Sequence, residues 1–336
     1  MEGKMKNPEW LNKLKPYAKP DPYRSFLYAA SSIVPYLLLL GIMFLLLMSG
    51  YPYWMVLSVS LLAAGFYIRT FMILHDCSHS SFVRSDKTSS ILGHVCGVLT
   101  FTPFYDWQKS HGIHHASVAN LDKRGTGDVW TMTLKEYRDA GKLKRLLYRT
   151  FRNPFFLFVF APIFLFLIVY RFPQGSTRKK ELFSIIITDS VLIIIIVAAY
   201  FTVGIKNYIA VQLPVLFIAT SAGMWLFYVQ HQFENVYWAR KEDWTLSRAA
   251  LEGSSYYKLP GVLRWFSGYI GYHTLHHLNP RIPCYNLKNC YNNVPELHDT
   301  VPVTLLTGLR SLRLHLWDED AGRLISFTEA SPKMKS

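Results

Sequence analysis

The sequence predicts an all-α integral membrane protein with four transmembrane helices, one or two interfacial or re-entrant segments, and a cytoplasmic helical cap. Two long stretches without Asp, Glu, Lys or Arg carry this prediction: residues 25–68 (44 residues) and residues 207–233 (27 residues). A helix that crosses a bilayer needs about 20 apolar residues. The composition agrees, because 51% of the 336 residues are hydrophobic and only 17% are charged, whereas soluble domains carry about 25% charged residues.

The first uncharged stretch is long enough for two helices. Ser49, Gly50 and Pro52 provide a turn near its middle, so we expect one helix at 31–48 and another at 53–74. The remaining apolar stretches are two further spans within 182–229 (182–205 and 208–229), a stretch at 91–105 that fits a helix lying in the membrane interface, and a stretch at 153–170. We expect the whole chain, 1–336, to be one membrane domain.

The distribution of Lys and Arg predicts the orientation. The N-terminal segment 1–30 is basic and is therefore expected in the cytoplasm. The stretch 153–170 has basic segments on both sides and Pro162 at its centre, so we interpret it as re-entrant. This places 75–152 at the cytoplasmic side or interface and 230–336 in a cytoplasmic cap. If 153–170 does span the membrane, the C-terminal third lies on the other side.

Composition also excludes several classes of protein. The apolar content is too high for a disordered chain. The net charge is +14, but the basic residues lie between apolar runs and form no single basic domain, so we expect no nucleic-acid binding. Four cysteines without a Cys-x-x-Cys pair predict neither a disulfide framework nor a zinc ribbon. No signal peptide is expected, because the first 24 residues are polar and contain six Lys or Arg.

Eight of the twelve histidines fall into three clusters: His75 and His79; His111, His114 and His115; and His273, His276 and His277. Residues three and four apart share a helix face, so each cluster can present its imidazoles to one metal ion from one side. All three clusters, together with His231 at the end of the last span, fall on the predicted cytoplasmic side. Imidazole binds Fe, Zn, Cu or Ni rather than Mg or Ca. Nine histidines are too many for one ion and suit two, so we predict a di-metal site.

Other interpretations of the histidines fit the sequence less well. The isolated His94, His298 and His315 are interpreted as surface or packed core residues. A metalloprotease motif requires Glu after its first histidine, whereas Asp76 follows His75. A histidine-rich metal transporter stays open as an alternative, but it would place its ligands near the bilayer midplane, and these clusters lie past the predicted helix ends.

The order HxxxH, HxxHH and HxxHH, set among four membrane helices, resembles the membrane fatty-acid desaturase family. The segments that resemble its bacterial acyl-lipid members most are 120–130, 231–235 and 271–283. The resemblance implies a non-haem centre of two iron ions, held by the eight box histidines and by a further histidine that His231 matches in position. Acyl-CoA members place an Asn one helical turn earlier, where it binds iron through water. That position is Phe227 here, which favours a membrane lipid as substrate.

The resemblance also implies the reaction: O₂-dependent introduction of a cis double bond into an acyl chain of a membrane lipid. An unactivated methylene has no acidic proton, so a strong oxidant formed from O₂ at reduced iron is needed. A fatty-acyl hydroxylase or related di-iron oxygenase on the same scaffold remains an alternative.

Residues near the boxes are expected to support this chemistry. Carboxylates and amides that could fix the imidazole tautomers are Asp76, Asp106, Asp128, Glu234 and Asn279. We expect Tyr105 and Trp107, with the 91–105 stretch, to line the entrance of an acyl tunnel. Asp189 lies inside an apolar run, where an ionisable group is often functional, but it is close to the helix start, so an interfacial position fits equally well. Arg69 is interpreted as extending to the cytoplasmic headgroups.

Each turnover needs two electrons from outside. The sequence has no haem-binding domain, no dinucleotide fingerprint and no cysteine cluster for an iron–sulfur centre. A separate donor is therefore expected, and an acidic ferredoxin or flavodoxin would complement the basic cytoplasmic face. Short loops suggest a bacterial plasma membrane.

Overall fold

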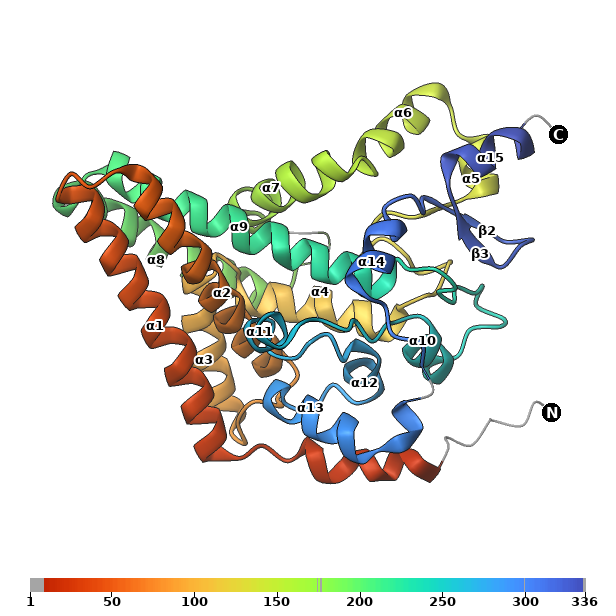
Figure 1. The fold of residues 1–336 in the computed structure, drawn as a ribbon, viewed down its shortest axis with the longest axis horizontal. Coiled ribbons are helices and arrows are strands. Elements are labelled where there is room, and N and C mark those ends of the chain that lie inside the picture. The colour runs from red at the N-terminus through yellow and green to blue at the C-terminus, as the bar shows by residue number, and fades with distance from the viewer. Residues whose placement is uncertain (1–8, 174, 176, 299, 335–336) are drawn as a thin grey trace.

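The computed structural model describes residues 9–173, 175, 177–298 and 300–334 (Figure 1). The first eight residues of the predicted N-terminal segment lie outside this part of the chain. The described chain is mainly helical, which confirms the predicted all-α class. Among the described residues, four helices are long and apolar enough to cross a membrane: α1 (Pro22–Met48), α2 (Tyr53–Ser78), α8 (Lys179–Thr202) and α9 (Ile205–His231).

Shorter elements complete the described chain. Between α2 and α8 lie α3 (Asp86–Leu99), α4 (Phe104–Ser117), β1 (Met132–Thr133), α5 (Leu134–Asp139), α6 (Lys142–Phe151), the π-helical turn η2 (Phe156–Phe160), α7 (Ala161–Leu167) and η3 (Val169–Arg171). After α9 come α10 (Leu246–Glu252), α11 (Gly261–Phe266), α12 (His273–Leu278), α13 (Cys284–Asn293), η4 (Pro295–Leu297), α14 (Leu305–Ser311), β2 (Leu316–Asp318), β3 (Arg323–Ile325) and α15 (Phe327–Lys333); η1 (Glu9–Ala18) precedes α1.

The ends of the spans differ from the prediction. Helix α1 begins at Pro22 rather than at 31, because the Asp21 side chain accepts a hydrogen bond from the Arg24 amide (3.0 Å) and Pro22 suits the first helical turn. Helix α2 continues to Ser78 rather than ending at 74. His75 therefore lies in the last turn of a long helix rather than after it. Helix α9 likewise extends through His231.

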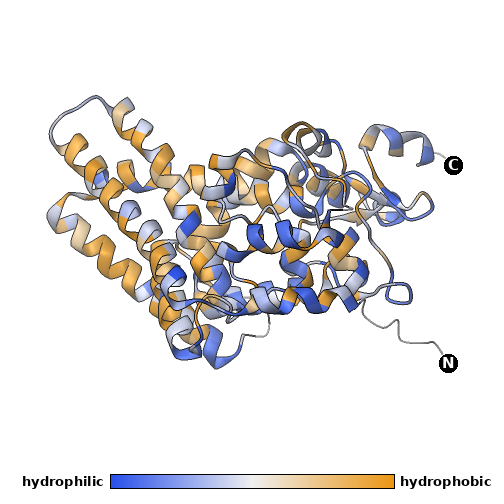
Figure 2. Ribbon diagram, turned by 60° about the horizontal axis from the view of Figure 1, so that its bottom comes forward, coloured by the Kyte–Doolittle hydropathy of each residue, from blue (hydrophilic) through white to orange (hydrophobic). Residues whose placement is uncertain are grey.

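The four spans form a bundle whose outer surface is apolar. Figure 2 shows hydrophobic residues concentrated on these helices, away from the end that carries the C-terminus. Large apolar side chains point outward, including Leu38, Leu61 and Ile194, while Met43 and Val211 are fully buried between the helices. A soluble protein would not expose so much continuous apolar surface, so we conclude that the bundle is embedded in a membrane.

The predicted interfacial helix at 91–105 is wrong in its extent, because the stretch is divided between two helices. Helix α3 ends at Leu99, and α4 begins at Phe104 after a short turn. Gly97 allows this turn to fold back, since a Cβ at that position would lie 2.4 Å from the Thr102 carbonyl oxygen. The turn leads directly into α4, which carries the second histidine cluster.

The stretch predicted to be re-entrant forms η2, α7 and η3. Together with α6 it makes a helical pair bent by 61°, which is either a broken span or a re-entrant loop. The re-entrant interpretation of 153–170 therefore stays a prediction.

A small sheet joins the middle of the chain to its C-terminal end. Strand β1 pairs parallel with β2 in the register Met132 to Leu316, and β2 pairs antiparallel with β3. The buried Arg152 strengthens this junction, because it donates hydrogen bonds to the Leu314 carbonyl (2.6 Å) and to Gln232 Oε1 (3.0 Å). The elements after α9 thereby form a cap at one end of the bundle, and its predicted cytoplasmic location stays a prediction.

Candidate metal centre

The structure brings nine histidines together at the end of the bundle, in two groups. The first group is His75, His79, His111, His115 and His276, and the second is His114, His231, His273 and His277. Within each group, the nitrogens that could bind a metal ion all lie within 4.8 Å of one another. These are the nine histidines that the sequence analysis selected, and the isolated His94, His298 and His315 belong to neither group.

Four helices supply the histidines. His75 and His79 come from the end of α2, and His231 is the last residue of α9. Helices α4 and α12 each contribute to both groups. In each HxxHH motif the two residues four apart join one group, while the remaining histidine joins the other. The expectation that each triplet faces one metal ion is therefore wrong: α4 and α12 pass between the two groups.

The imidazoles face one another through their Nε2 atoms. In the first group the Nε2–Nε2 distances are 3.1 Å from His115 to His111 and 3.0 Å from His276 to His115. In the second group His231 Nε2 lies 3.1 Å from His114 Nε2 and 2.9 Å from His273 Nε2. Two ligands about 2.1 Å from one ion, at a right angle, would be about 3.0 Å apart. The spacing fits shared coordination.

The protonation of the imidazoles also fits metal binding. Burial lowers the pKa of His79, His111, His115, His273, His276 and His277 well below 6.5, and the neighbouring imidazoles lower it further. Neutral imidazole is the form that binds a metal ion. The buried Nε2 atoms of His75 and His79 have no hydrogen-bond partner among the described residues. A metal ion would satisfy these atoms.

Two carboxylates contact the Nδ1 atoms of histidines, as the sequence suggested for Asp76 and Asp128. Asp76 Oδ1 lies 3.0 Å from His75 Nδ1, and Asp76 Oδ2 accepts a hydrogen bond from the Cys284 amide (2.6 Å) at the start of α13. Asp128 Oδ1 lies 2.8 Å from His114 Nδ1. If Nδ1 of each histidine carries the proton, Nε2 is left with a lone pair directed into its group.

The other predicted supporting residues make no hydrogen bond to a box histidine within the described ranges. Asp106 is buried, and burial raises the pKa of its carboxyl. Glu234 is exposed, and Asn279 Oδ1 accepts from the Arg281 amide (3.2 Å). Sequence reasoning missed the group that orients His231: its Nδ1 lies 3.1 Å from the Gly253 carbonyl oxygen. Every residue has a backbone carbonyl, so this partner could not be predicted from the type of amino acid at position 253.

A large apolar cavity of about 1620 Å³ reaches the histidines. Its walls come from α2, α4, α7 and α9 and from the loop before β1, and His75, His111 and His273 are among its lining residues. Both groups therefore border it. Phe227 lines the cavity too, with its ring centroid 5.3 Å from that of His114 and 5.4 Å from that of His231.

The two predicted tunnel residues differ. Trp107 lines the cavity and stacks on His111, with ring centroids 4.3 Å apart. Tyr105 is not among the lining residues, nor is any other residue of 91–105. The Tyr105 hydroxyl pairs with Ser90 (2.5 Å), and the Lys180 ammonium lies over its ring. The expectation that Tyr105 and that stretch line the entrance therefore stays a prediction.

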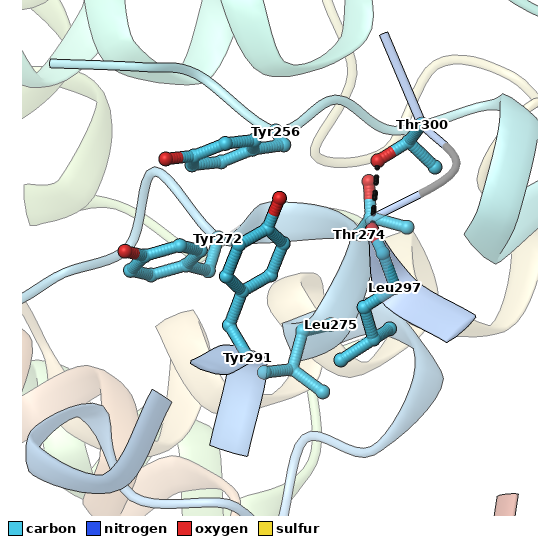
Figure 3. Close-up of a pocket in the computed structure, with 7 residues that line it drawn as sticks. All are labelled: Tyr256, Tyr272, Thr274, Leu275, Tyr291, Leu297 and Thr300. Carbon is cyan, nitrogen blue, oxygen red and sulfur yellow. Dashed lines mark hydrogen bonds between the residues drawn. The ribbon is translucent and has the colours of Figure 1, made fainter. Parts of the chain in front are cut away.

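A second, small hollow lies behind α12 (Figure 3). Its volume is about 10 Å³, which accommodates little more than one water molecule. Tyr256 and Tyr272 stack there with ring centroids 4.9 Å apart, and Tyr291 packs against both. This aromatic cluster supports the helix of the third histidine cluster and leaves no room for an acyl chain.

The fold and the site define a membrane-embedded protein whose two histidine groups border a cavity large enough for a lipid chain. Comparison with known proteins identifies the family. The profile described as "Fatty acid desaturase" matches residues 52–304. The chain therefore belongs to the fatty acid desaturase family, and it is an oxidoreductase of that class.

Individual relatives agree with this assignment. The chain is 42% identical to a "Fatty acid desaturase" of Bacillus subtilis (strain 168) over 93% of this chain and 88% of the relative. It is 24% identical to an "sn-1 oleoyl-lipid 12-desaturase" of Synechocystis sp. over 75% and 73% of the two chains. It is 28% identical to an "sn-1 acyl-lipid omega-3 desaturase (ferredoxin)" of Nostoc sp. over 65% and 61%.

Proposed function

We propose that this protein is an acyl-lipid desaturase that uses O₂ to introduce a cis double bond into an acyl chain of a membrane lipid. One observation carries the proposal: an apolar cavity of about 1620 Å³ borders both histidine groups in a protein with membrane-spanning helices. The reaction converts –CH₂–CH₂– with O₂, two electrons and two protons to –CH=CH– and two water molecules. Oxidation of the chain supplies the other two electrons that O₂ takes up.

The nine histidines would hold two iron ions, one in each group. Nitrogen ligands suit iron, and the close Nε2 spacing within each group supports a shared ion. When bound, the iron would supply the oxidising power that an unactivated methylene requires. Asp76 and Asp128 would keep His75 and His114 in the tautomer that leaves Nε2 free to coordinate.

The remaining task of the protein is to position the chain and to exclude water. Trp107 stacks on His111, and Phe227 packs against His114 and His231, so aromatic surfaces shield both groups from the open part of the cavity. An alkyl chain held against these rings would keep one pair of methylenes beside the histidines. Fixed positioning of this kind selects the bond that reacts.

A separate electron donor would dock on the face of the cap. One relative carries "ferredoxin" in its name, and the net charge of +14 on this chain complements an acidic ferredoxin or flavodoxin. We place the metal centre on the cytoplasmic side of a bacterial plasma membrane, because the basic segments flank the same ends of the spans. The transporter alternative is not favoured, since the histidines lie at the ends of α2 and α9 rather than in mid-span.

Expression in a host without desaturases tests the proposal. Gas chromatography and mass spectrometry of the derivatised fatty acids should show a new C=C bond, whose position identifies the reacting carbons. His114→Ala should abolish the product, whereas His298→Ala, outside both groups, should retain it. A C–OH product would indicate a hydroxylase instead. Absence of any oxidised lipid from iron-loaded protein supplied with reductant would refute the proposal.

A further inference from the structure

Helix α6 has an apolar face that no described residue covers. Leu143, Leu146 and Leu147 lie on one side of the helix, at the spacing i, i+3, i+4. Their exposed fractions are 69%, 61% and 54%. Three leucines exposed together on one short helix indicate a surface that something apolar covers in the membrane-bound protein.

The opposite side of α6 is fixed to the protein. Tyr148 is fully buried, its hydroxyl donates to the His315 carbonyl, and it accepts a hydrogen bond from the Met132 amide (3.1 Å). Phe151, at the end of the helix, lines the large cavity. The leucine face is therefore held in a defined orientation next to the cavity.

The flanks of the leucine face are basic. Lys142, Lys144 and Arg149 are exposed, and Arg145 is half-buried. No Asp or Glu occurs between residues 140 and 155. Four charged side chains in ten residues exclude α6 from the hydrocarbon core, but basic residues beside an apolar face are typical of a helix that lies in the headgroup layer.

The apolar face of α6 is continuous in the chain with a lipid-facing surface. Beyond the bend after Phe151, the next segment exposes Phe155, Phe160 and Phe164. Taken together, α6 and the η2–η3 segment are long and apolar enough to form a bent membrane segment. A bilayer that covers these phenylalanines would also reach the leucines, which favours lipid over a protein partner.

We propose that α6 is an interfacial helix that binds anionic phospholipid headgroups at the mouth of the acyl cavity. Its leucines enter the upper acyl region, and Lys142, Lys144 and Arg145 attract the phosphates. A lipid held there would have its acyl chain beside Phe151 and the cavity. The presentation of substrate lipid rests on the proposed function, whereas the lipid contact itself does not.

Fluorescence quenching by spin-labelled lipids tests the contact directly. The four native cysteines are buried, so Leu146→Cys can be labelled with bimane in the full-length protein in nanodiscs. The nanodiscs contain phosphatidylglycerol and phosphatidylcholine, with one of the two spin-labelled at a time. Ile194→Cys on the bundle surface is the lipid-exposed control, and Asp320→Cys in the β2–β3 turn is the control on the cap.

The Leu146 probe should be quenched as strongly as the Ile194 probe, and more by the anionic lipid than by the neutral one. Each basic side chain near an anionic surface favours it by up to about fivefold. The variant Lys142→Gln/Lys144→Gln/Arg145→Gln should bring the two lipids to parity while the Ile194 probe is unchanged. Quenching at the level of the Asp320 probe, or equal quenching by both lipids in the unmodified helix, would overturn the inference.

The outcome is separable from the proposed function, because quenching needs neither O₂ nor reductant. Desaturation without quenching at Leu146 would refute the inference alone. Quenching with anionic preference, but without a double bond in the lipid products, would refute the proposed function alone.

Discussion

Gly223 of α9 should determine how long an acyl chain can be accommodated. It lines the cavity, and a Cβ added there would meet no atom within 4 Å. It lies eight residues before His231, which is about 12 Å along the helix. An extended chain advances about 1.2 Å per bond, so the side chain of Gly223→Phe would obstruct a chain about ten bonds beyond the histidines. Overpacking costs about 1–3 kcal/mol, which is about 5- to 150-fold in rate for chains that need this space.

The assay is chain-length preference in a host that lacks desaturases. Saturated acids of different lengths are supplied, and conversion at each length is measured by gas chromatography and mass spectrometry. The ratio of long-chain to short-chain product should fall by about tenfold in Gly223→Phe. Gly41→Phe is the matched control, because Gly41 is exposed on α1 and its added Cβ would also meet no atom within 4 Å. An unchanged ratio, or the same shift in the control, would refute this assignment of the cavity.

Three further predictions concern the metal groups and the cap. Asp128→Asn should lower iron affinity, or activity, by about 10- to 100-fold because His114 loses the carboxylate that fixes its tautomer; the exposed Asp122→Asn should not, and equal losses would contradict the argument. Chelation of the metal should lower the melting temperature in detergent, since the imidazoles of each group would lose the ion that they bind together; an unchanged melting temperature after measured metal loss would argue against coordination. Burial and, to a smaller extent, the nearby Arg152 charge lower the pKa of His315 from 6.5 to about 4. As the pH falls below 6.5, the unfolded chain binds a proton at this histidine before the folded chain does, so the free energy of unfolding decreases towards pH 4. His315→Gln should therefore show a smaller drop in melting temperature between pH 7 and pH 5, and an equal drop would exclude His315 as a contributor.

Hydropathy predicts the spans well but not their ends. His75, Asp76 and Ser78 are polar, so a hydropathy argument ends the helix at Leu74, whereas the structure continues it because His75 is enclosed among histidines of α4 and the cap. The same reason extends α9 through His231. Polarity at the end of a membrane helix indicates that lipid stops there, not that the helix does.

Spacing was enough to select the eight clustered histidines, and position at the end of a span selected His231, but the division of the nine into two groups could not be predicted. Whether His111 and His114 face the same group depends on where the axis of α4 runs, and that position is set by packing against α8 and α2. Partners reached through the backbone, such as the Gly253 carbonyl beside His231, leave no trace in residue identity. The rotation of Tyr105 towards Ser90 depends on contacts between α3 and α4 that the local sequence does not encode.

Metal analysis of the purified protein tests the central claim most directly. Iron measured by mass spectrometry on protein that is active in desaturation should amount to two ions per chain. His231→Ala and His276→Ala, one from each group, should each lower this value. A value of zero, a value of one, or zinc in place of iron in the active protein would contradict a centre of two irons held by these histidines.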